Sequence, residues 1–442
     1  MAIAMTQAMH RLPLTAPGPL GPHNNPSPLE QMLPTSIARQ SLEQLRAAFI
    51  SAVARGDWNV ALHNAEKALS IVGDHPTVIG ALALCQSRLG RLEEALKNYR
   101  IATSLAPDDF NLFDGLAVAC GHAGDSIGAR AAGMTALTLR DKQRRAQTWR
   151  LPATLPPPLS NDRSRNVIAY SVFGSDPKYC ETAVLNVSAA RAAFPCWTTR
   201  FYLDISSTPP NIAHRLRAAG AEVVETSRES LGGLPPLLWR FQVMDDPAVD
   251  RWLIRDADSL LSVREAVAVQ DWLSSDAWHH VMRDYFSHTE LLLAGLIGGC
   301  GGIYHGVADH MRDFATSWNK PHPRFLDQHF LRDYVWPTAR ESLATHDSLF
   351  GFHGGRPFPP HPDHGYGAKF HVGSNFASDE ICVRCGTPTA GAVAWRLFDT
   401  NGTLICAYDA PVFDGEWRAA LPKTYIDRLR AGDWRLEAVA KQ

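Results

Sequence analysis

The sequence lacks any long apolar run. No stretch of about 18 consecutive apolar residues occurs in the chain, so no segment is expected to span a bilayer as a helix. The first 40 residues are rich in Pro, Met, Ala and Asn and contain no apolar core of the kind that a signal peptide needs. These absences argue against a membrane-embedded protein, and we expect a soluble, cytoplasmic one.

Cysteine is sparse and charge is balanced. The eight cysteines are scattered along the chain, which is typical of a reducing compartment and not of a disulfide scaffold. Cys382 and Cys385 form one Cys-x-x-Cys pair, but a zinc site would need a second such pair or paired histidines nearby. With 43 Lys and Arg against 45 Asp and Glu, the net charge of −2 gives no overall field that would attract nucleic acid or an anionic membrane.

A repeat of 34 residues runs from about position 42 to 143. Small residues recur at this period in three cycles, namely Gly56, Gly90 and Gly124, then Ala61, Ala95 and Ala129, then Ala68, Ala102 and Ala136. This is the tetratricopeptide period, with each glycine in the turn between two helices and each alanine allowing close helix packing. Residues 41–143 are therefore predicted to form three helical repeats, serving either as a cap or self-association surface or as a binding surface for the acceptor or a protein partner.

The rest of the chain divides by composition. Residues 1–40 are expected to be disordered, 144–164 to be a Pro-rich linker, 165–377 to be an α/β domain, and 378–442 to be a small β-rich appendage with a hairpin at Asn401-Gly402. Strands are expected at 167–173, 200–203, 221–225, 251–255 and 279–283, and helices at 181–193, 212–219, 237–244 and 266–273. This alternation predicts a mostly parallel sheet with helices on both faces, so the whole is a multidomain fold.

Two carboxylates follow the apolar strand Trp252-Leu253-Ile254. Asp256 and Asp258 stand one residue apart at the end of this strand, where ligands bind in open α/β sheets. Together they can hold one hard cation, Mn²⁺ or Mg²⁺, which in turn can carry a nucleotide diphosphate. They could instead cap the next helix, but Ser262 and Glu265 already form a capping box there.

Four segments together resemble a glycosyltransferase of the A-type fold, in particular bacterial enzymes of polysaccharide or glycan assembly. They are the opening strand "VIAYSVFG", then "RWLIRDADS", "FLDQHFL" and the late "FHVGSN", and the resemblance covers roughly residues 165–376. It implies transfer of a sugar from a nucleotide-sugar donor, with the metal held by Asp256 and Asp258 through an Asp-x-Asp motif and completed by His371. It also implies that Ser171 and Phe173, at the end of the first strand, contact the donor.

Other polar residues are candidates for the donor site. Arg240, in "LLWRF", can clamp a phosphate or stack on a base, or it can hold a carboxylate structurally. Arg283 and Asp284 close the next strand and His288 follows, so all three are expected to face the same cleft and contact sugar or acceptor. The alternative is that Arg283 and Asp284 form an ion pair with each other.

A glycine-rich segment and a helical run complete the candidate residues. Gly298 and Gly299, in "LAGLIGGCGGIY", would let the backbone approach a flat sugar ring, or else form a tight turn. Gln328 is expected to contact the donor. If the reaction inverts the anomeric centre, Asp327 or Asp284 would serve as the general base that deprotonates the acceptor, whereas a retaining reaction need have no such base.

The function favoured by these patterns is a metal-dependent glycosyltransferase acting on a glycan, polysaccharide or protein acceptor. One alternative is a tetratricopeptide adaptor with a non-catalytic α/β domain, against which the intact Asp256 and Asp258 argue. Another is a sugar nucleotidyltransferase, but such enzymes usually open with a Gly-rich basic loop, whereas "VFGSDPKY" offers only Gly174 and Lys178.

Overall fold

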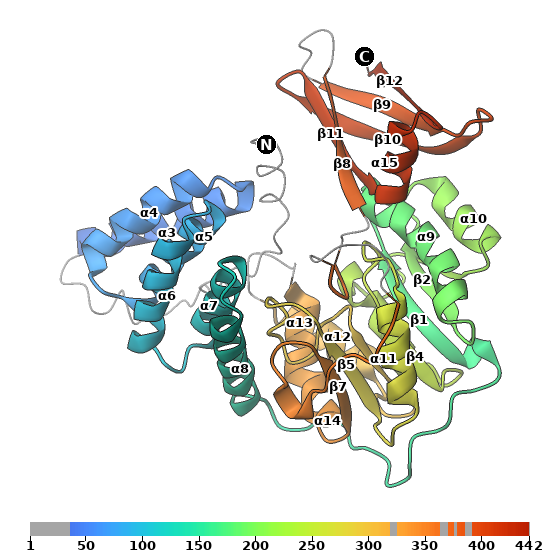
Figure 1. Ribbon diagram of the computed structural model, residues 1–442, viewed down its shortest axis with the longest axis horizontal. Coiled ribbons are helices and arrows are strands. Elements are labelled where there is room, and N and C mark those ends of the chain that lie inside the picture. The colour runs from blue at the N-terminus through green and yellow to red at the C-terminus, as the bar shows by residue number, and fades with distance from the viewer. Residues whose placement is uncertain (1–35, 319–324, 363–369, 375–377, 385–390, 442) are drawn as a thin grey trace.

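A computed structural model describes residues 36–318, 325–362, 370–374, 378–384 and 391–441 of the chain. Figure 1 shows a helical region at the N-terminal side, a central α/β region and a C-terminal sheet. Of the segment predicted to be disordered, residues 1–35 lie outside the described residues, and the remainder belongs to helix α3, which begins at Ser36. Within the described ranges, no helix is both long and apolar enough to span a bilayer.

The 34-residue repeat forms three consecutive helix pairs. They are α3 (Ser36–Arg55) with α4 (Trp58–Val72), α5 (Pro76–Arg88) with α6 (Leu92–Leu105), and α7 (Phe110–His122) with α8 (Ser126–Lys142). Gly56, Gly90 and Gly124 occupy the turn within each pair with φ of 73°, 77° and 79°, a left-handed conformation that favours glycine. The repeating alanines are buried, so the small residues set both the turns and the close approach of the helices.

The central sheet has seven strands in the order β3-β2-β1-β4-β6-β5-β7. Its strands are β1 (Asn166–Val172), β2 (Thr198–Asp204), β3 (Glu222–Thr226), β4 (Arg251–Ile254), β5 (His279–Arg283), β6 (Ile297–Cys300) and β7 (Leu343–Asp347). Its helices are α9 (Pro177–Ala193), α10 (Pro210–Ala218), α11 (Val263–Leu273), α12 (Val307–Thr316), α13 (Leu326–Phe330) and α14 (Trp336–Ala339), with a 3₁₀ helix at Pro236–Asp245 and a π-helical turn at Leu331–Val335. Only β6 is antiparallel to its neighbours, so the predicted mostly parallel sheet is present with one reversed strand.

The reversed strand β6 is the glycine-rich segment, which the sequence suggested would approach a sugar ring or make a turn. Both interpretations need correction, because Gly298 and Gly299 lie inside this buried strand. A Cβ atom on Gly299 would lie 2.2 Å from Cζ2 of Trp252, and one on Gly298 would lie 2.6 Å from Cδ2 of Leu253. Glycine is needed here because large β4 side chains fill the space beside β6.

The predicted linker is irregular, as its prolines require, but it is packed against the α/β region. Trp149 is buried, its indole N–H donates to the carbonyl of His305 at 2.9 Å, and its own carbonyl accepts from the Thr338 hydroxyl at 2.8 Å. Arg251 of β4 donates to the carbonyl of Pro157. The predicted Pro-rich linker is therefore held against the α/β region by these contacts.

The C-terminal region is a five-stranded antiparallel sheet in the order β12-β9-β10-β11-β8. Its elements are β8 (Ser378–Arg384), β9 (Gly391–Phe398), β10 (Leu404–Phe413), β11 (Glu416–Pro422), α15 (Lys423–Arg430) and β12 (Arg435–Ala440). The predicted hairpin joins β9 to β10, with Gly402 at φ 78°. Cys382 lies on exposed β8, and Cys385, its partner in the Cys-x-x-Cys pair, lies outside the described residues.

A buried carboxylate fastens this sheet to α9. Glu181 of α9 is fully buried and accepts two hydrogen bonds of 2.7 Å from Arg215 of α10. The same carboxylate accepts from the hydroxyls of Tyr408 at 2.6 Å and Tyr425 at 3.2 Å. Both tyrosines belong to the C-terminal region, so this region is packed into the α/β core and is not a loose appendage.

Candidate functional site

Five ionisable side chains meet beyond the carboxyl end of β4. Asp256 and Asp258 follow that strand directly, Arg240 comes from the 3₁₀ helix, Lys178 from the first turn of α9, and Asp327 from α13. The turn that carries the two aspartates is anchored on both sides. Arg255 donates to the buried Glu265 of α11 at 2.9 Å, and Ser262 caps α11 as predicted, which leaves Asp256 and Asp258 free for another role.

Arg240 joins two of the carboxylates. Its guanidinium is buried and donates to the Asp256 carboxylate, to the Arg255 carbonyl at 3.0 Å, and to Oδ2 of Asp327 at 3.0 Å. Ser171, predicted to contact the donor, instead uses its hydroxyl to accept from the Arg240 backbone N–H at 3.0 Å. The structural alternative for Arg240 therefore holds in this arrangement, since its guanidinium positions carboxylates.

Asp258 pairs with a residue that sequence reasoning did not place in the site. The Lys178 ammonium lies 2.8 Å from Oδ2 of Asp258, and both side chains are less than one-fifth exposed. Lys178 also lies over the Tyr179 ring, with Nζ 4.4 Å from the centroid. The helix was expected at 181–193, whereas α9 begins at Pro177 and so includes Lys178 in its first turn, where a cation opposes the helix dipole.

The cluster is short of positive charge. Three carboxylates face two cations, so it carries one net negative charge when every group is ionised. Burial raises the pKa of Asp327 to about 6, against the lowering effect of Arg240 and together with the repulsion from Asp256. Burial also raises the pKa of Asp258, with Lys178 opposing that rise and Asp256 adding to it.

Asp256 and Asp258 offer the type of ligand atom that a hard divalent cation prefers. They offer carboxylate oxygens in a net negative cluster, and the Asp256 side chain is 43% exposed and open to a ligand. Mg²⁺ and Mn²⁺ commonly take one or two carboxylates and fill the remaining positions with water and phosphate oxygens. Among the described residues, no three His, Cys, Asp or Glu side chains come together as a metal ion would require, so a protein-only site is not preformed there.

His371 does not complete that pair of aspartates. Its ring stacks on Tyr285 at 4.0 Å between centroids and meets the His288 ring edge-on at 5.1 Å. Burial lowers the pKa of His371, so its ring is neutral at pH 7. In this arrangement His371 belongs to an aromatic cluster and not to a group of three metal-ligating side chains, so its role as a metal ligand stays a prediction.

The residues expected to close β5 toward the cleft are engaged internally. Asp284 is buried and accepts from Arg264 at 2.6 and 2.8 Å, from the Ser348 hydroxyl at 2.7 Å and from the Val372 N–H at 3.0 Å. In this arrangement Asp284 thus holds neighbouring segments together, and its role as general base stays a prediction. The expected ion pair between Arg283 and Asp284 is also absent from the contacts of these two described residues.

Arg283 and His288 support the following loop. Arg283 is fully buried and donates to the carbonyls of Glu290 and Leu291. Nδ1 of His288 accepts from the Asp284 N–H at 3.0 Å. Both side chains thus make internal hydrogen bonds, and their contact with sugar or acceptor stays a prediction.

Gln328 holds the segment that leads into β6. Its amide nitrogen donates to the Leu292 carbonyl at 2.7 Å and its amide oxygen accepts from the Ala294 N–H at 2.6 Å. Its predicted contact with the donor would require these bonds to break. Phe173 is the predicted donor contact that stays available, since it follows β1 and is 37% exposed.

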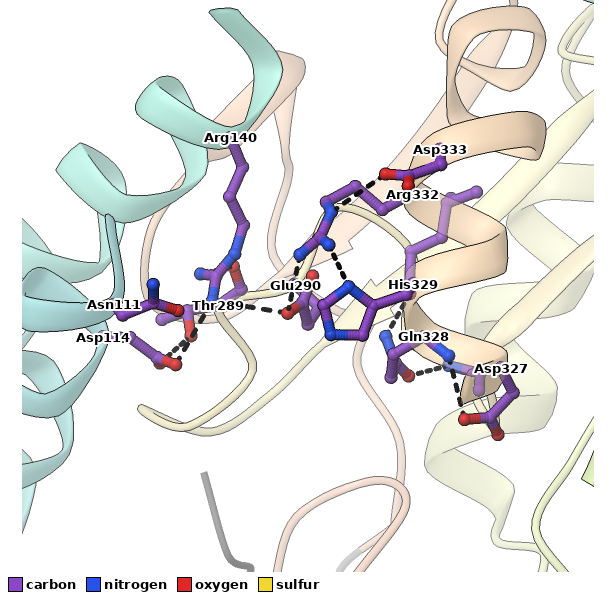
Figure 2. A network of polar contacts seen from close by, with 12 residues as sticks. Asn111, Asp114, Arg140, Thr289, Glu290, Asp327, Gln328, His329, Arg332 and Asp333 are labelled. Atoms are coloured by element: carbon purple, nitrogen blue, oxygen red, sulfur yellow. Dashed lines mark hydrogen bonds and ion pairs between the residues drawn. The ribbon is translucent and has the colours of Figure 1, made fainter. Parts of the chain in front are cut away.

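A buried polar network connects the repeats to helix α13 (Figure 2). Arg140 of α8 donates to the Thr289 carbonyl at 2.8 Å and lies 3.3 Å from the carboxylates of Asp114 and Glu290. Glu290 is also 3.8 Å from Arg332, which contacts His329 on the helix that carries Asp327. The third repeat is thus built into the support of the candidate site.

Comparisons with known proteins give only distant similarities. No protein-family model matches the chain, and no curated protein matches it. Among solved structures, the chain is similar to the Sgt2 tetratricopeptide domain from Aspergillus fumigatus, with 24% identity over 25% of this chain and 70% of that one, at a TM-score of 0.22.

Two further solved structures are glycosyltransferases. A mutant O-GlcNAc transferase from Thermobaculum terrenum is 17% identical over 50% of this chain and 46% of that one, at a TM-score of 0.26. The mannosyltransferase PcManGT from Pyrobaculum calidifontis, solved in complex with GDP-Man and Mn²⁺, is 14% identical over 54% of this chain and 67% of that one, at a TM-score of 0.30.

Proposed function

We propose that this protein is a metal-dependent glycosyltransferase that moves a sugar from a nucleotide-sugar donor to a glycan, polysaccharide or protein acceptor. The observation that carries the proposal is the cluster of Asp256, Asp258, Arg240, Lys178 and Asp327 beyond β4, at the sheet edge where nucleotides bind in α/β folds. A cluster of buried charges with perturbed pKa values at such an edge is typical of a functional site.

Charge balance supports the need for a cation. A donor diphosphate brings further negative charge to a cluster that is already net negative, which is unfavourable in a partly buried site. Bound Mn²⁺ or Mg²⁺ supplies Lewis-acid neutralisation of the leaving diphosphate. The chain's own contribution is to hold Asp256 and Asp258 in place, the first through Arg240 and the second through Lys178.

Asp327 is the residue we propose as general base if the reaction inverts the anomeric centre. The acceptor hydroxyl loses its proton to Asp327 while its oxygen bonds to the sugar's anomeric carbon, and the bond from that carbon to the diphosphate oxygen breaks. A pKa of about 6 suits this role, because the carboxylate is mostly ionised at neutral pH yet basic enough to accept a proton. Arg240 fixes its position at 3.0 Å.

The first two repeats are proposed to hold the acceptor or a partner protein. Their helices α3 to α6 build small hydrophobic clusters outside the main core, two of which also include Leu112 and Ala119 of α7, whereas Leu137 of α8 belongs to the main core. The third repeat therefore anchors the array, and the first two extend from it as a helical surface (Figure 1).

A nucleotide-sugar panel tests the proposal. Purified protein is incubated with UDP-, GDP-, dTDP- and CMP-linked sugars in the presence of Mn²⁺, Mg²⁺ or EDTA, and thermal stabilisation and nucleotide release are measured. We expect stabilisation by one nucleotide only when metal is present. If no nucleotide stabilises the protein under any condition, the enzyme proposal fails and the adaptor function is favoured instead.

A further inference from the structure

We infer that Lys178 is an exchangeable cation, which pairs with Asp258 until a divalent cation binds that carboxylate and then pairs with the donor diphosphate. The inference rests on the proposed function and adds a residue to it. Lys178 then acts both as a competitor of the metal and as a ligand of the nucleotide.

The position of Lys178 at the start of a helix is electrostatically unfavourable and requires a nearby anion. α9 has Asp176 as its N-cap and Pro177 next, so Lys178 lies in the first turn, at the positive end of a helix of 17 residues. A cation is unfavourable there, and an anion is favoured. Asp258 offsets this cost at 2.8 Å, and a phosphate group at the same place would meet both the ammonium and the helix end.

The two cations of the cluster differ in how firmly they are held. Arg240 is bonded to Asp256, Asp327 and the Arg255 carbonyl, and its side chain is only 5% exposed. Lys178 has a flexible stem, pairs with one carboxylate and is 19% exposed. Arg240 is therefore a fixed support, while Lys178 can change partner by rotation of its side chain.

A divalent cation and Lys178 compete for the same carboxylate charge. When a cation binds Asp258, the ion pair at 2.8 Å is weakened and the partly buried ammonium needs a new anion. The donor diphosphate is the anion that arrives with the metal. Metal and nucleotide are then expected to bind cooperatively. Bound metal releases Lys178 from Asp258 for the diphosphate, and bound diphosphate draws Lys178 away from the carboxylate that the metal needs.

Replacement of Lys178 by Met has two expected effects of opposite sign. Lys178→Met removes the competitor, so Mn²⁺ alone is expected to bind about tenfold more tightly. The same change removes a phosphate ligand, so UDP or GDP, whichever binds wild type, is expected to bind about tenfold more weakly at saturating Mn²⁺. A purely structural lysine would not give this opposed pair of shifts.

Binding of Mn²⁺ is measured by paramagnetic resonance of the free ion, and binding of UDP and GDP is measured by calorimetry. Full-length wild type, Lys178→Met, Lys178→Gln and the control Lys97→Met are compared, because Lys97 is exposed on α6 in the second repeat. Circular dichroism verifies that each variant is folded, and Lys178→Gln replaces Lys178→Met if the latter unfolds. The control is expected to match wild type in both titrations.

The outcomes separate this inference from the proposed function. If wild type binds neither Mn²⁺ nor any nucleotide, the proposed function fails. If wild type binds both but the Lys178 variants lose both, change neither, or gain metal affinity without losing nucleotide affinity, the exchange of partners by Lys178 is overturned.

Discussion

The guanidinium of Arg140, in the last repeat helix, lies 3.3 Å from the carboxylate of Glu290 in the α/β region. The same guanidinium lies 3.3 Å from Asp114, and its side chain is only 2% exposed. A buried cation thus neutralises two carboxylates that come from different parts of the chain (Figure 2). Repeats and α/β region are consequently joined by the ion pair between Arg140 and Glu290.

Arg140→Met should destabilise the protein by about 3–5 kcal/mol, because it leaves the buried Asp114 without a cation and leaves Glu290 with only Arg332, at 3.8 Å. Chemical denaturation of the full chain measures the loss. Arg91→Met is the control, since Arg91 is exposed at the start of α6. A loss no larger than that of the control would show that the ion pair does not stabilise the interface.

Removal of the repeats should damage the α/β region. A chain that begins at residue 162 lacks Leu137 and Trp149, which are buried in the main core, and exposes Phe286, which packs against Gly121. We expect it to be insoluble or to melt at least about 5 °C lower than a chain beginning at residue 107, which keeps α7 and α8. Equal melting temperatures for the two chains would contradict this expectation.

Asp258→Asn should reduce sugar transfer about 100-fold or more and weaken Mn²⁺ binding in parallel, because it removes a ligand charge without a change in size. The measurements are the rate of nucleotide release and a Mn²⁺ titration of the same samples. Asp309→Asn serves as control, since that carboxylate is 76% exposed on α12. Wild-type turnover by Asp258→Asn at saturating metal would remove Asp258 from the site.

Activity should depend on the ionisation of Asp327. A general base must be deprotonated, so with a pKa of about 6 the value of kcat/KM should be constant above that pH and fall below it. Asp327→Asn should lose activity throughout the range. A wild-type profile that stays flat from about pH 5 to 8 would exclude this base.

His371→Ala should leave Mn²⁺ affinity unchanged and destabilise the fold by about 1 kcal/mol. The reason is that His371 stacks on Tyr285 at 4.0 Å and contributes packing, not ligation. A Mn²⁺ titration beside Asp258→Asn and a denaturation curve measure the two effects. If metal affinity falls as it does in Asp258→Asn, then His371 moves to the metal when the ion binds.

Local patterns allowed much of the fold to be predicted. The period of 34 residues correctly placed Gly56, Gly90 and Gly124 in turns, because each helix pair needs a residue with positive φ at the same point of its turn. Strand β5 was predicted at the residues where it occurs, and Ser262 caps α11 as its spacing with Glu265 indicated. Each of these features depends on neighbours along the chain.

Features that depend on partners far along the chain were not predictable in this way. The reversed strand β6 is glycine-rich because of Trp252 and Leu253 in β4, and the glycines themselves carry no sign of that. Asp284 was assigned to the site from its position after β5, and His371 from the resemblance to A-type glycosyltransferases. In the structure Asp284 accepts hydrogen bonds from Arg264 and Ser348, and His371 stacks on Tyr285. Such contacts between distant residues cannot be predicted from one sequence.

The main hydrophobic core runs without interruption from Leu137 in the last repeat to Ile426 in α15. The boundaries between regions that were expected from composition therefore do not divide the protein into parts that unfold independently. The α/β region, the third repeat and the C-terminal sheet should lose structure in one cooperative transition, with calorimetric and van't Hoff enthalpies that agree. Helices α3 to α6 contribute mainly to smaller clusters outside this core, two of which reach Leu112 and Ala119 of α7. Hydrogen exchange should therefore be fastest in α3 and α4, which lie furthest along the array from α8.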